Sequence, residues 1–163
     1  MNSLVVYGSR HGNTHKLAEA IAFELGRHGV VQLVSAEDAR KVLPEQLDLV
    51  VVGGPTEAHR ITEPVAQFFD HVGKDQLVGV AAAAFDTRLR WPEWLSGSAA
   101  AGIAQRLHQA RAKLIAPEVS FFVSGKLPVL EPGEVERAAA WAASLASKVE
   151  SKVESKKSVL LVL

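Results

Sequence analysis

The stretch Leu49-Val50-Val51-Val52 limits the possible folds more than any other part of the sequence, because it is apolar without alternation. A strand with one wet face alternates apolar and polar residues, whereas an uninterrupted apolar strand is covered on both faces. Strands of this kind are typical of parallel sheets that lie between two layers of helices. We therefore expect a buried parallel sheet.

Apolar runs and amphipathic runs alternate about five times along the chain. Further short apolar runs predict strands at residues 4–7, 30–34, 79–85 and 119–123. Helical spacing of apolar residues predicts the intervening helices, with faces at Leu17, Ala18, Ile21 and Leu25, at Val65, Phe68, Phe69 and Val72, at Ala100, Ile103, Leu107 and Leu114, and at Val135, Ala138, Ala142, Leu145 and Val149. Strands separated by helices pair in parallel, because each crossover returns the chain to the same edge. The predicted fold class is α/β, a doubly wound sheet of five parallel strands in a three-layer sandwich.

The charge balance and the lack of cysteine exclude several function classes. Acidic and basic residues number 18 each, so the net field attracts neither nucleic acid nor a membrane surface, and no aromatic-basic pattern supports nucleic-acid binding. Without cysteine there are no disulfides, thiolate metal sites or cysteine nucleophiles. The N-terminal apolar run is too short for a signal peptide, and no window approaches the roughly 20 apolar residues of a membrane span. We expect a soluble cytoplasmic protein without nucleic-acid or membrane partners.

The loop after the first strand has a composition that suits an anion. Ligands of doubly wound sheets bind beyond the carboxyl ends of the strands, so the loops after the first, third and fourth strands are the candidates. The first loop lacks both the triphosphate P-loop pattern and the dinucleotide fingerprint. Gly12 lets backbone amides approach a ligand, and Thr14 opens a helix whose free amides and dipole favour negative charge. Two interpretations stay open here, a phosphate site and an ordinary turn with a helix cap.

This loop, Ser9-Arg10-His11-Gly12-Asn13-Thr14, resembles the phosphate loop of flavodoxins, whose usual pattern is Ser/Thr-x-Thr-Gly-Asn-Thr. His11 stands where that family usually has threonine. The order of predicted elements is also similar to flavodoxins over all but the C-terminal tail. The segments "GGPT" at residues 53–56 and "AFDTR" at residues 84–88 are similar to those of short flavodoxin-like proteins. The resemblance implies a strand order of 2-1-3-4-5 and a non-covalently bound flavin mononucleotide (FMN).

The resemblance also assigns the cofactor contacts to the three loops. The backbone of the second loop, which follows the third strand at residues 53–60, would lie beside the isoalloxazine ring. Asp86 and Thr87 would form hydrogen bonds with the pyrimidine edge of that ring. Trp91 would stack on the ring, or would instead cap the core. Arg88 would bind nearby, or would pair with Asp86 in a purely structural bridge. The predicted cofactor-binding residues are Ser9, Arg10, His11, Gly12, Asn13, Thr14, Gly54, Pro55, Thr56, Glu57, Phe85, Asp86, Thr87, Arg88 and Trp91.

No catalytic residue and no metal site is predicted. The nucleophile elbow of Ser/His/Asp hydrolases is absent, and His11 and His15 lack a third ligand at metal spacing. In a flavoprotein the cofactor performs the redox chemistry, so the resemblance implies electron transfer or reduction of a small acceptor. The neutral charge favours a reductase or sensor over an electron carrier, and the redox partner is not specified. The alternative is a non-enzymatic module on the same fold that binds a phosphate ligand or another protein.

The C-terminal tail is set apart by its composition. It repeats Ser-Lys-Val-Glu twice and ends in an apolar run. We expect residues 1–149 to form the flavodoxin-like domain and residues 150–163 to form an extension, either a continued helix or a flexible tail. The apolar run is interpreted either as a frayed or surface-packed end or as an element for self-association into a homo-oligomer.

Overall fold

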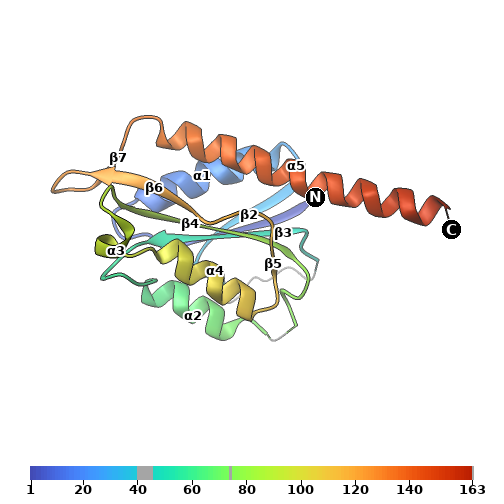
Figure 1. The fold of residues 1–163 in the computed structure, drawn as a ribbon, viewed down its shortest axis with the longest axis horizontal. Coiled ribbons are helices and arrows are strands. Elements are labelled where there is room, and N and C mark those ends of the chain that lie inside the picture. Colours follow the sequence, from blue (N-terminus) through green and yellow to red (C-terminus); the bar gives the residue numbers. More distant parts are fainter. Residues whose placement is uncertain (40–45, 74, 163) are drawn as a thin grey trace.

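A sheet runs through the middle of the molecule and separates two layers of helices (Figure 1). The computed structural model describes residues 1–39, 46–73 and 75–162. Its central strands are β1 (Asn2–Tyr7), β2 (Val30–Ser35), β3 (Leu49–Pro55), β4 (Ala81–Leu89) and β6 (Val119–Ser124). They pair in parallel in the order β2-β1-β3-β4-β6. The doubly wound order implied by the family resemblance is therefore confirmed.

Over the residues that the structure describes, the sheet has seven strands, not the five that the sequence predicted. The predicted fifth strand is preceded by a short strand, β5 (Lys113–Leu114), which pairs with the start of β4, while β6 pairs with its end. Pro117 lies in the gap between β5 and β6, where its missing N–H cannot join the ladder. A further short strand, β7 (Val129–Leu130), runs antiparallel to β6 and forms a hairpin with it.

Helices α1 (Asn13–Gly26) and α5 (Glu134–Val162) cover one face of the sheet, and α2 (Glu63–His71) and α4 (Ala99–Gln109) cover the other (Figure 1). A single-turn helix, α3 (Glu93–Ser96), precedes α4. The prediction that Leu114 belongs to the fourth helix is wrong. Arg111 adopts a left-handed backbone angle (φ of 62°) just after α4, and the chain then enters β5.

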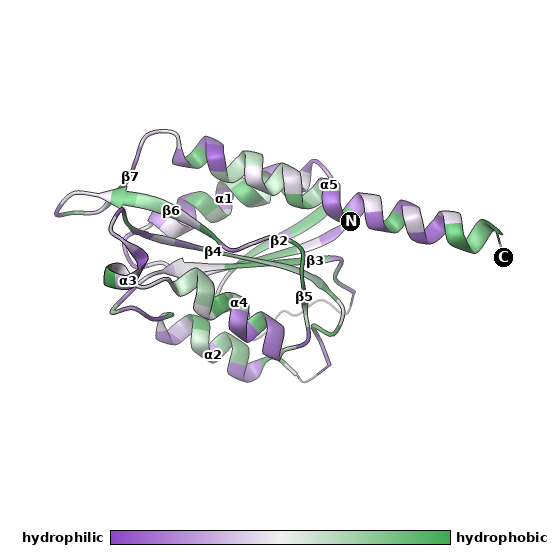
Figure 2. Cartoon of the chain, viewed as in Figure 1, coloured by the Kyte–Doolittle hydropathy of each residue, from purple (hydrophilic) through white to green (hydrophobic). Residues whose placement is uncertain are grey.

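The hydrophobic core has two parts, one on each face of the sheet, as expected for a sheet whose central strands are apolar without alternation. Val50 and Val52 of β3 pack toward α2 and α4, whereas Val51 packs toward α1 and α5. Figure 2 shows the sheet between helices along which hydrophobic and hydrophilic residues alternate. The two faces of each central strand are thus buried in separate clusters, and polar side chains are left for the ends of the strands.

The start of α5 is fixed by a buried carboxylate. Glu134 is only 6% exposed and accepts hydrogen bonds from the Phe122 backbone N–H at 2.7 Å and from the Arg137 guanidinium at 2.6 and 2.9 Å. Burial by itself raises the pKa of the Glu134 carboxyl. The bonds from Arg137 and Phe122 outweigh burial and hold the pKa below its ordinary value of 4.5.

This carboxylate makes the fold sensitive to acid. A carboxyl whose pKa is lower in the folded chain stabilises the fold above its unfolded pKa, and this contribution is lost as the pH falls through the folded value. We expect Glu134→Gln to cost about 1–2 kcal/mol of unfolding free energy near neutral pH, and this difference from wild type to shrink below about pH 4.5. Urea titrations at several pH values measure it. Glu136→Gln, on the exposed side of the same turn, is the control and should show no such convergence.

Helix α5 continues well beyond the sheet (Figure 1). Every described residue from Glu150 onward is exposed, and Val159, Leu160, Leu161 and Val162 expose 62–86% of their surface. No helix in the described part of the chain is both long and apolar enough to cross a membrane. The division into a domain of residues 1–149 and an extension stays a prediction.

Candidate functional site

Three loops meet at the carboxyl ends of the parallel strands and enclose a cavity of about 270 Å³. The loop after β1 supplies one wall, the end of β3 with the following turn supplies the second, and the end of β4 supplies the third. The β6–β7 hairpin closes the cavity with Val123 and Pro128. A second cavity of about 250 Å³ adjoins it, since Ser9, Arg10, Pro55 and Glu57 line both.

The first loop leaves the N-terminus of α1 open. Gly12 is the N-cap residue in a left-handed conformation (φ of 83°), and no side chain caps the helix. The first amides of a helix have no carbonyl partner within it, so these donors and the helix dipole are available to an anion. The Ser9 hydroxyl accepts from the Gly12 N–H at 3.1 Å and folds the loop back on itself.

Two side chains at the start of α1 tie the loop to distant elements. The Thr14 hydroxyl lies 3.0 Å from the Thr87 hydroxyl of β4, and both residues are buried. The Asn13 amide donates to the Pro128 carbonyl at 2.7 Å. These contacts hold the β1 loop, the end of β4 and the hairpin in one fixed arrangement around the cavity.

Tyr7, the last residue of β1, packs behind this loop. Its ring stacks on His15 of α1 with centroids 4.7 Å apart. Burial, followed by the negative charges of Glu19, Glu37 and Asp38, raises the pKa of the Tyr7 phenol. Tyr7 therefore stays protonated and neutral over the physiological range.

The turn after β3 is strained at its tip. Ala58 and His59 both have positive φ angles, 45° and 66°, and Glu57 and Arg60 exchange two backbone hydrogen bonds across them. Two-residue turns of this kind favour asparagine and glycine, so Ala58 and His59 store backbone strain. Strain of this sort clusters at ligand-binding sites. The Arg10 guanidinium lies 3.3 Å from the Glu57 carboxylate and links this turn to the first loop at the surface.

Asp86 of β4 fixes the turn to the start of α4. It is fully buried, and its Oδ2 accepts from the Thr56 hydroxyl at 2.9 Å, the Ser98 hydroxyl at 3.0 Å and the Ala100 N–H at 2.9 Å. Thr56 also accepts from the Ala99 N–H at 2.8 Å. The carboxylate thus lies at the N-terminus of a helix, where negative charge is favoured.

The segment after β4 exposes two tryptophan side chains, neither of which lines the two cavities. Arg88 holds this segment, since its guanidinium donates to the Ser120 hydroxyl, the Trp91 carbonyl and the Ser96 hydroxyl at 2.9–3.1 Å. Trp91 is 54% exposed and Trp94 is 84% exposed. The predicted alternative for Arg88, a bridge to Asp86, is absent among the described contacts.

The sequence matches the family of the flavodoxin domain over residues 4–93, more than half of the chain. This range contains the loops after β1 and β3 and the whole of β4. The chain belongs to the flavodoxin family. No curated protein matches the sequence.

Solved structures of flavodoxins share this fold at low sequence identity. A flavodoxin from the domain Archaea is 23% identical, with a TM-score of 0.73 over 92% of this chain and 99% of its own. Flavodoxin 1 from Bacillus cereus is 20% identical, with a TM-score of 0.74 over 90% of this chain and 98% of its own. Rubredoxin oxygen:oxidoreductase from Desulfovibrio gigas is 18% identical, with a TM-score of 0.71, and here 93% of this chain covers 37% of the longer protein.

The flavodoxin fold brings most of the predicted cofactor residues to one place. Those that line the cavity are Ser9, Arg10, His11, Asn13, Thr14, Pro55, Thr56, Glu57, Thr87 and Arg88. Gly12, Gly54, Phe85, Asp86 and Trp91 do not line it. Phe85 belongs to the core on the α1 and α5 side, and Trp91 lies on the exposed segment after β4.

Sequence reasoning missed several residues of the site. Leu89, Val123 and Pro128 line the first cavity, and Glu37, Thr62, Glu63 and Pro64 line the second. Pro128 reaches the site because the hairpin folds over the start of α1. The turn signals Gly125 and Pro128 after an apolar strand were the one sequence signal for that hairpin.

Proposed function

We propose that this flavodoxin-family protein binds FMN non-covalently and transfers electrons or reduces a small acceptor. The observation that carries the proposal is the uncapped N-terminus of α1, which faces a cavity at the carboxyl end of the sheet. A phosphate suits this place, because backbone amides, the helix dipole and the nearby Ser9 and Arg10 side chains all favour negative charge.

The rest of the site suits a planar ring. Gly54 and Pro55 end β3 without bulky side chains, and Trp91 leaves half of its surface open on the neighbouring segment. Aromatic surface of this kind stacks well on a flat heterocycle. Bound there, the flavin would supply reversible uptake of electrons. The protein would hold it through the residues of the three loops, and Arg10 would exchange its surface pair with Glu57 for the phosphate.

Titration with FMN tests the proposal. We expect the flavin fluorescence to be quenched at a 1:1 ratio, and riboflavin, which lacks the phosphate, to bind at least about tenfold more weakly because hydrogen bonds to a charged group are lost. Equal binding of FMN and riboflavin would show that the first loop does not hold a phosphate. Failure of both to bind would end the proposal.

His11 offers a sharper variant. It is exposed and replaces the threonine that is usual in flavodoxins, so His11→Thr should add a hydroxyl donor to the phosphate and tighten FMN binding by about tenfold. Riboflavin affinity and the urea midpoint should stay unchanged. His108→Thr, a matched change on the exposed side of α4, should alter none of these quantities. If the His11→Thr variant also bound riboflavin more tightly, the gain in affinity would not come from a contact with the phosphate.

A second candidate function is a non-enzymatic module that binds a phosphorylated ligand through the same loop. The turn after β3 favours it, because its tip carries Ala58 and His59 and offers no large aromatic side chain for the second face of a flavin. Such a module would bind inorganic phosphate and FMN with similar affinity, and the same titrations with phosphate as competitor distinguish the two.

A further inference from the structure

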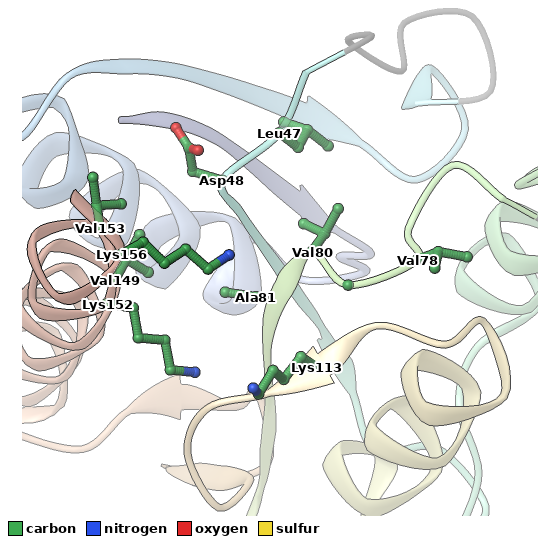
Figure 3. A pocket seen from close by; sticks show the side chains of 11 residues that line it. Leu47, Asp48, Val78, Val80, Ala81, Lys113, Val149, Lys152, Val153 and Lys156 are labelled. Atoms are coloured by element: carbon green, nitrogen blue, oxygen red, sulfur yellow. The ribbon is translucent and has the colours of Figure 1, made fainter. Parts of the chain in front are cut away.

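A larger hollow lies at the opposite end of the sheet from the three loops. Its volume is about 500 Å³, and it is bounded by the entry to β3, the start of β4, the short strand β5 and residues 149–156 of α5. Figure 3 shows the side chains that project into it. None of its lining residues is shared with the cavities at the carboxyl ends of the strands.

Three lysines from two elements point into this hollow. Lys152 and Lys156 extend from successive turns of α5, and Lys113 extends toward them from β5 (Figure 3). Within the described part of the chain, none of the three has an ion pair or a side-chain hydrogen bond. Lys148, one turn earlier, does bond to the protein and donates to the Ile115 carbonyl at 3.2 Å.

The described lining of the hollow therefore carries net positive charge, three lysines against one carboxylate. That carboxylate belongs to Asp48, the one acidic side chain among the described lining residues, and its Oδ2 accepts from the Asn2 N–H at 2.7 Å. Like charges that converge across a concave surface repel one another and raise the local potential. An anion placed among the three ammonium groups removes that repulsion.

The rest of the lining is apolar. Val78, Val80 and Leu47 lie on the sheet side, and Val149 and Val153 lie on the helix side. Val78 and Val153 expose 40% and 42% of their surface. A ligand that fills the hollow would bury this apolar surface as well as meet the lysines, so a small inorganic anion would use only part of the site.

We propose that this hollow is a second binding site, for an organic anion that carries a sulfate, phosphate or carboxylate group on an apolar chain. Lys113, Lys152 and Lys156 bind the acidic group, and Val78, Val80, Val149 and Val153 contact the chain. The site does not depend on FMN binding, because the two sites lie at opposite ends of the strands.

Octyl sulfate is a suitable probe because it joins a charged group to an apolar chain. Octyl glucoside has the same chain without the charge, and inorganic sulfate has the charge without the chain. At 17.5 kDa the protein suits two-dimensional amide NMR. We expect octyl sulfate, below its micelle concentration, to shift the amides of Val80, Lys113, Val149 and Val153 in a saturable 1:1 manner. Octyl glucoside and inorganic sulfate should each bind at least about tenfold more weakly. Shifts confined to residues 9–14, or spread over the whole surface, would overturn the proposal.

Charge-matched variants separate this site from general attraction to a basic helix. Lys152→Gln/Lys156→Gln should weaken octyl sulfate binding at least about tenfold. Lys126→Gln/Lys157→Gln removes the same charge from exposed lysines outside the hollow and should change it by less than about twofold. Equal effects of the two double variants would overturn the proposal, as would wild-type affinity in the first.

The apolar part of the lining is tested separately. Val153→Ser should weaken the binding of octyl sulfate but not that of inorganic sulfate, and Val159→Ser should change neither affinity.

Two sources of such a ligand are distinguished by vesicles. A free amphiphile is supported when octyl sulfate binds and vesicles of phosphatidylglycerol do not co-sediment the protein. A lipid is supported when the vesicles compete with octyl sulfate for the same amides and Lys152→Gln/Lys156→Gln weakens both. Co-sedimentation that needs Val159–Val162 but not Lys152 and Lys156 would overturn the site. The proposal would also be overturned if sedimentation detected a dimer whose formation by itself shifted the amide signals of the residues that line the hollow.

Discussion

Replacing Asp86 with alanine is expected to lower the free energy of unfolding by about 3–5 kcal/mol. The substitution leaves the hydroxyls of Thr56 and Ser98 and the backbone N–H of Ala100 without their common acceptor in a fully buried place. It also removes the negative charge at the N-terminus of α4. Urea unfolding, followed by far-UV circular dichroism, measures the loss.

Two variants sharpen this prediction. Asp86→Asn keeps the size and one acceptor oxygen, so it should lose about half as much stability as the alanine variant. Asp75→Ala removes an aspartate whose side chain is 89% exposed and should change stability by less than about 0.5 kcal/mol. A loss below about 1 kcal/mol for Asp86→Ala would mean that Thr56 and Ser98 find other partners and that this carboxylate does not hold the turn.

The same carboxylate shows where sequence reasoning stops. The motif at residues 84–88 drew attention to Asp86 because the predicted fourth strand ended at Phe85. The strand in fact continues to Leu89, so Asp86 lies inside β4, three residues before its end. Its environment depends on donors 30 and 14 residues away, Thr56 and Ala100, which come together only once β3, β4 and α4 are packed. The spacing of residues in the sequence does not show which donors will meet Asp86. The sequence alone therefore could not distinguish an Asp86 that contacts a cofactor from one that serves as a buried structural acceptor.

The parallel pairing of the strands and the burial of the central strands could be predicted from local sequence patterns, whereas the strand order came from the resemblance to flavodoxins. The run of β3 is apolar without alternation and its residues are buried on both faces, and the helices between the strands impose parallel pairing. The β6–β7 hairpin was not foreseen, because its place in the site depends on one long-range bond from Asn13 to Pro128. The turn at Ala58 and His59 was hidden too, since neither residue signals the positive φ angles it adopts.

The structure gives Gly53 a role in core packing that the sequence did not predict. It belongs to the segment "GGPT" at residues 53–56, which is similar to that of short flavodoxin-like proteins, and in the structure it lies inside β3. A Cβ atom at Gly53 would lie 2.1–2.4 Å from three ring carbons of Phe85 on the neighbouring strand. Phe85 packs edge-on against Phe121 and Trp141, at centroid distances of 6.0 and 6.1 Å, so its ring has no free space to enter.

We therefore expect Gly53→Ala to cost about 3 kcal/mol or more of unfolding free energy, because the added methyl group overpacks a core aromatic cluster. Gly54→Ala is the matched control. Its Cβ would meet Val65 at 3.3 Å, a contact that a small shift relieves, so the cost should stay near 1 kcal/mol. Urea unfolding measures both.

A double-mutant cycle identifies the cause. Phe85→Leu alone should destabilise by about 1–2 kcal/mol through loss of buried volume, and in its presence Gly53→Ala should become nearly neutral. Additive effects would show that the Phe85 ring is not what excludes a side chain from Gly53. If the cycle shows the coupling, the first glycine of the pair serves the core beneath the site. Gly54, whose Cβ direction faces Val65 of α2 and Ile103 of α4, then remains as the one glycine of the pair whose side-chain direction does not meet Phe85.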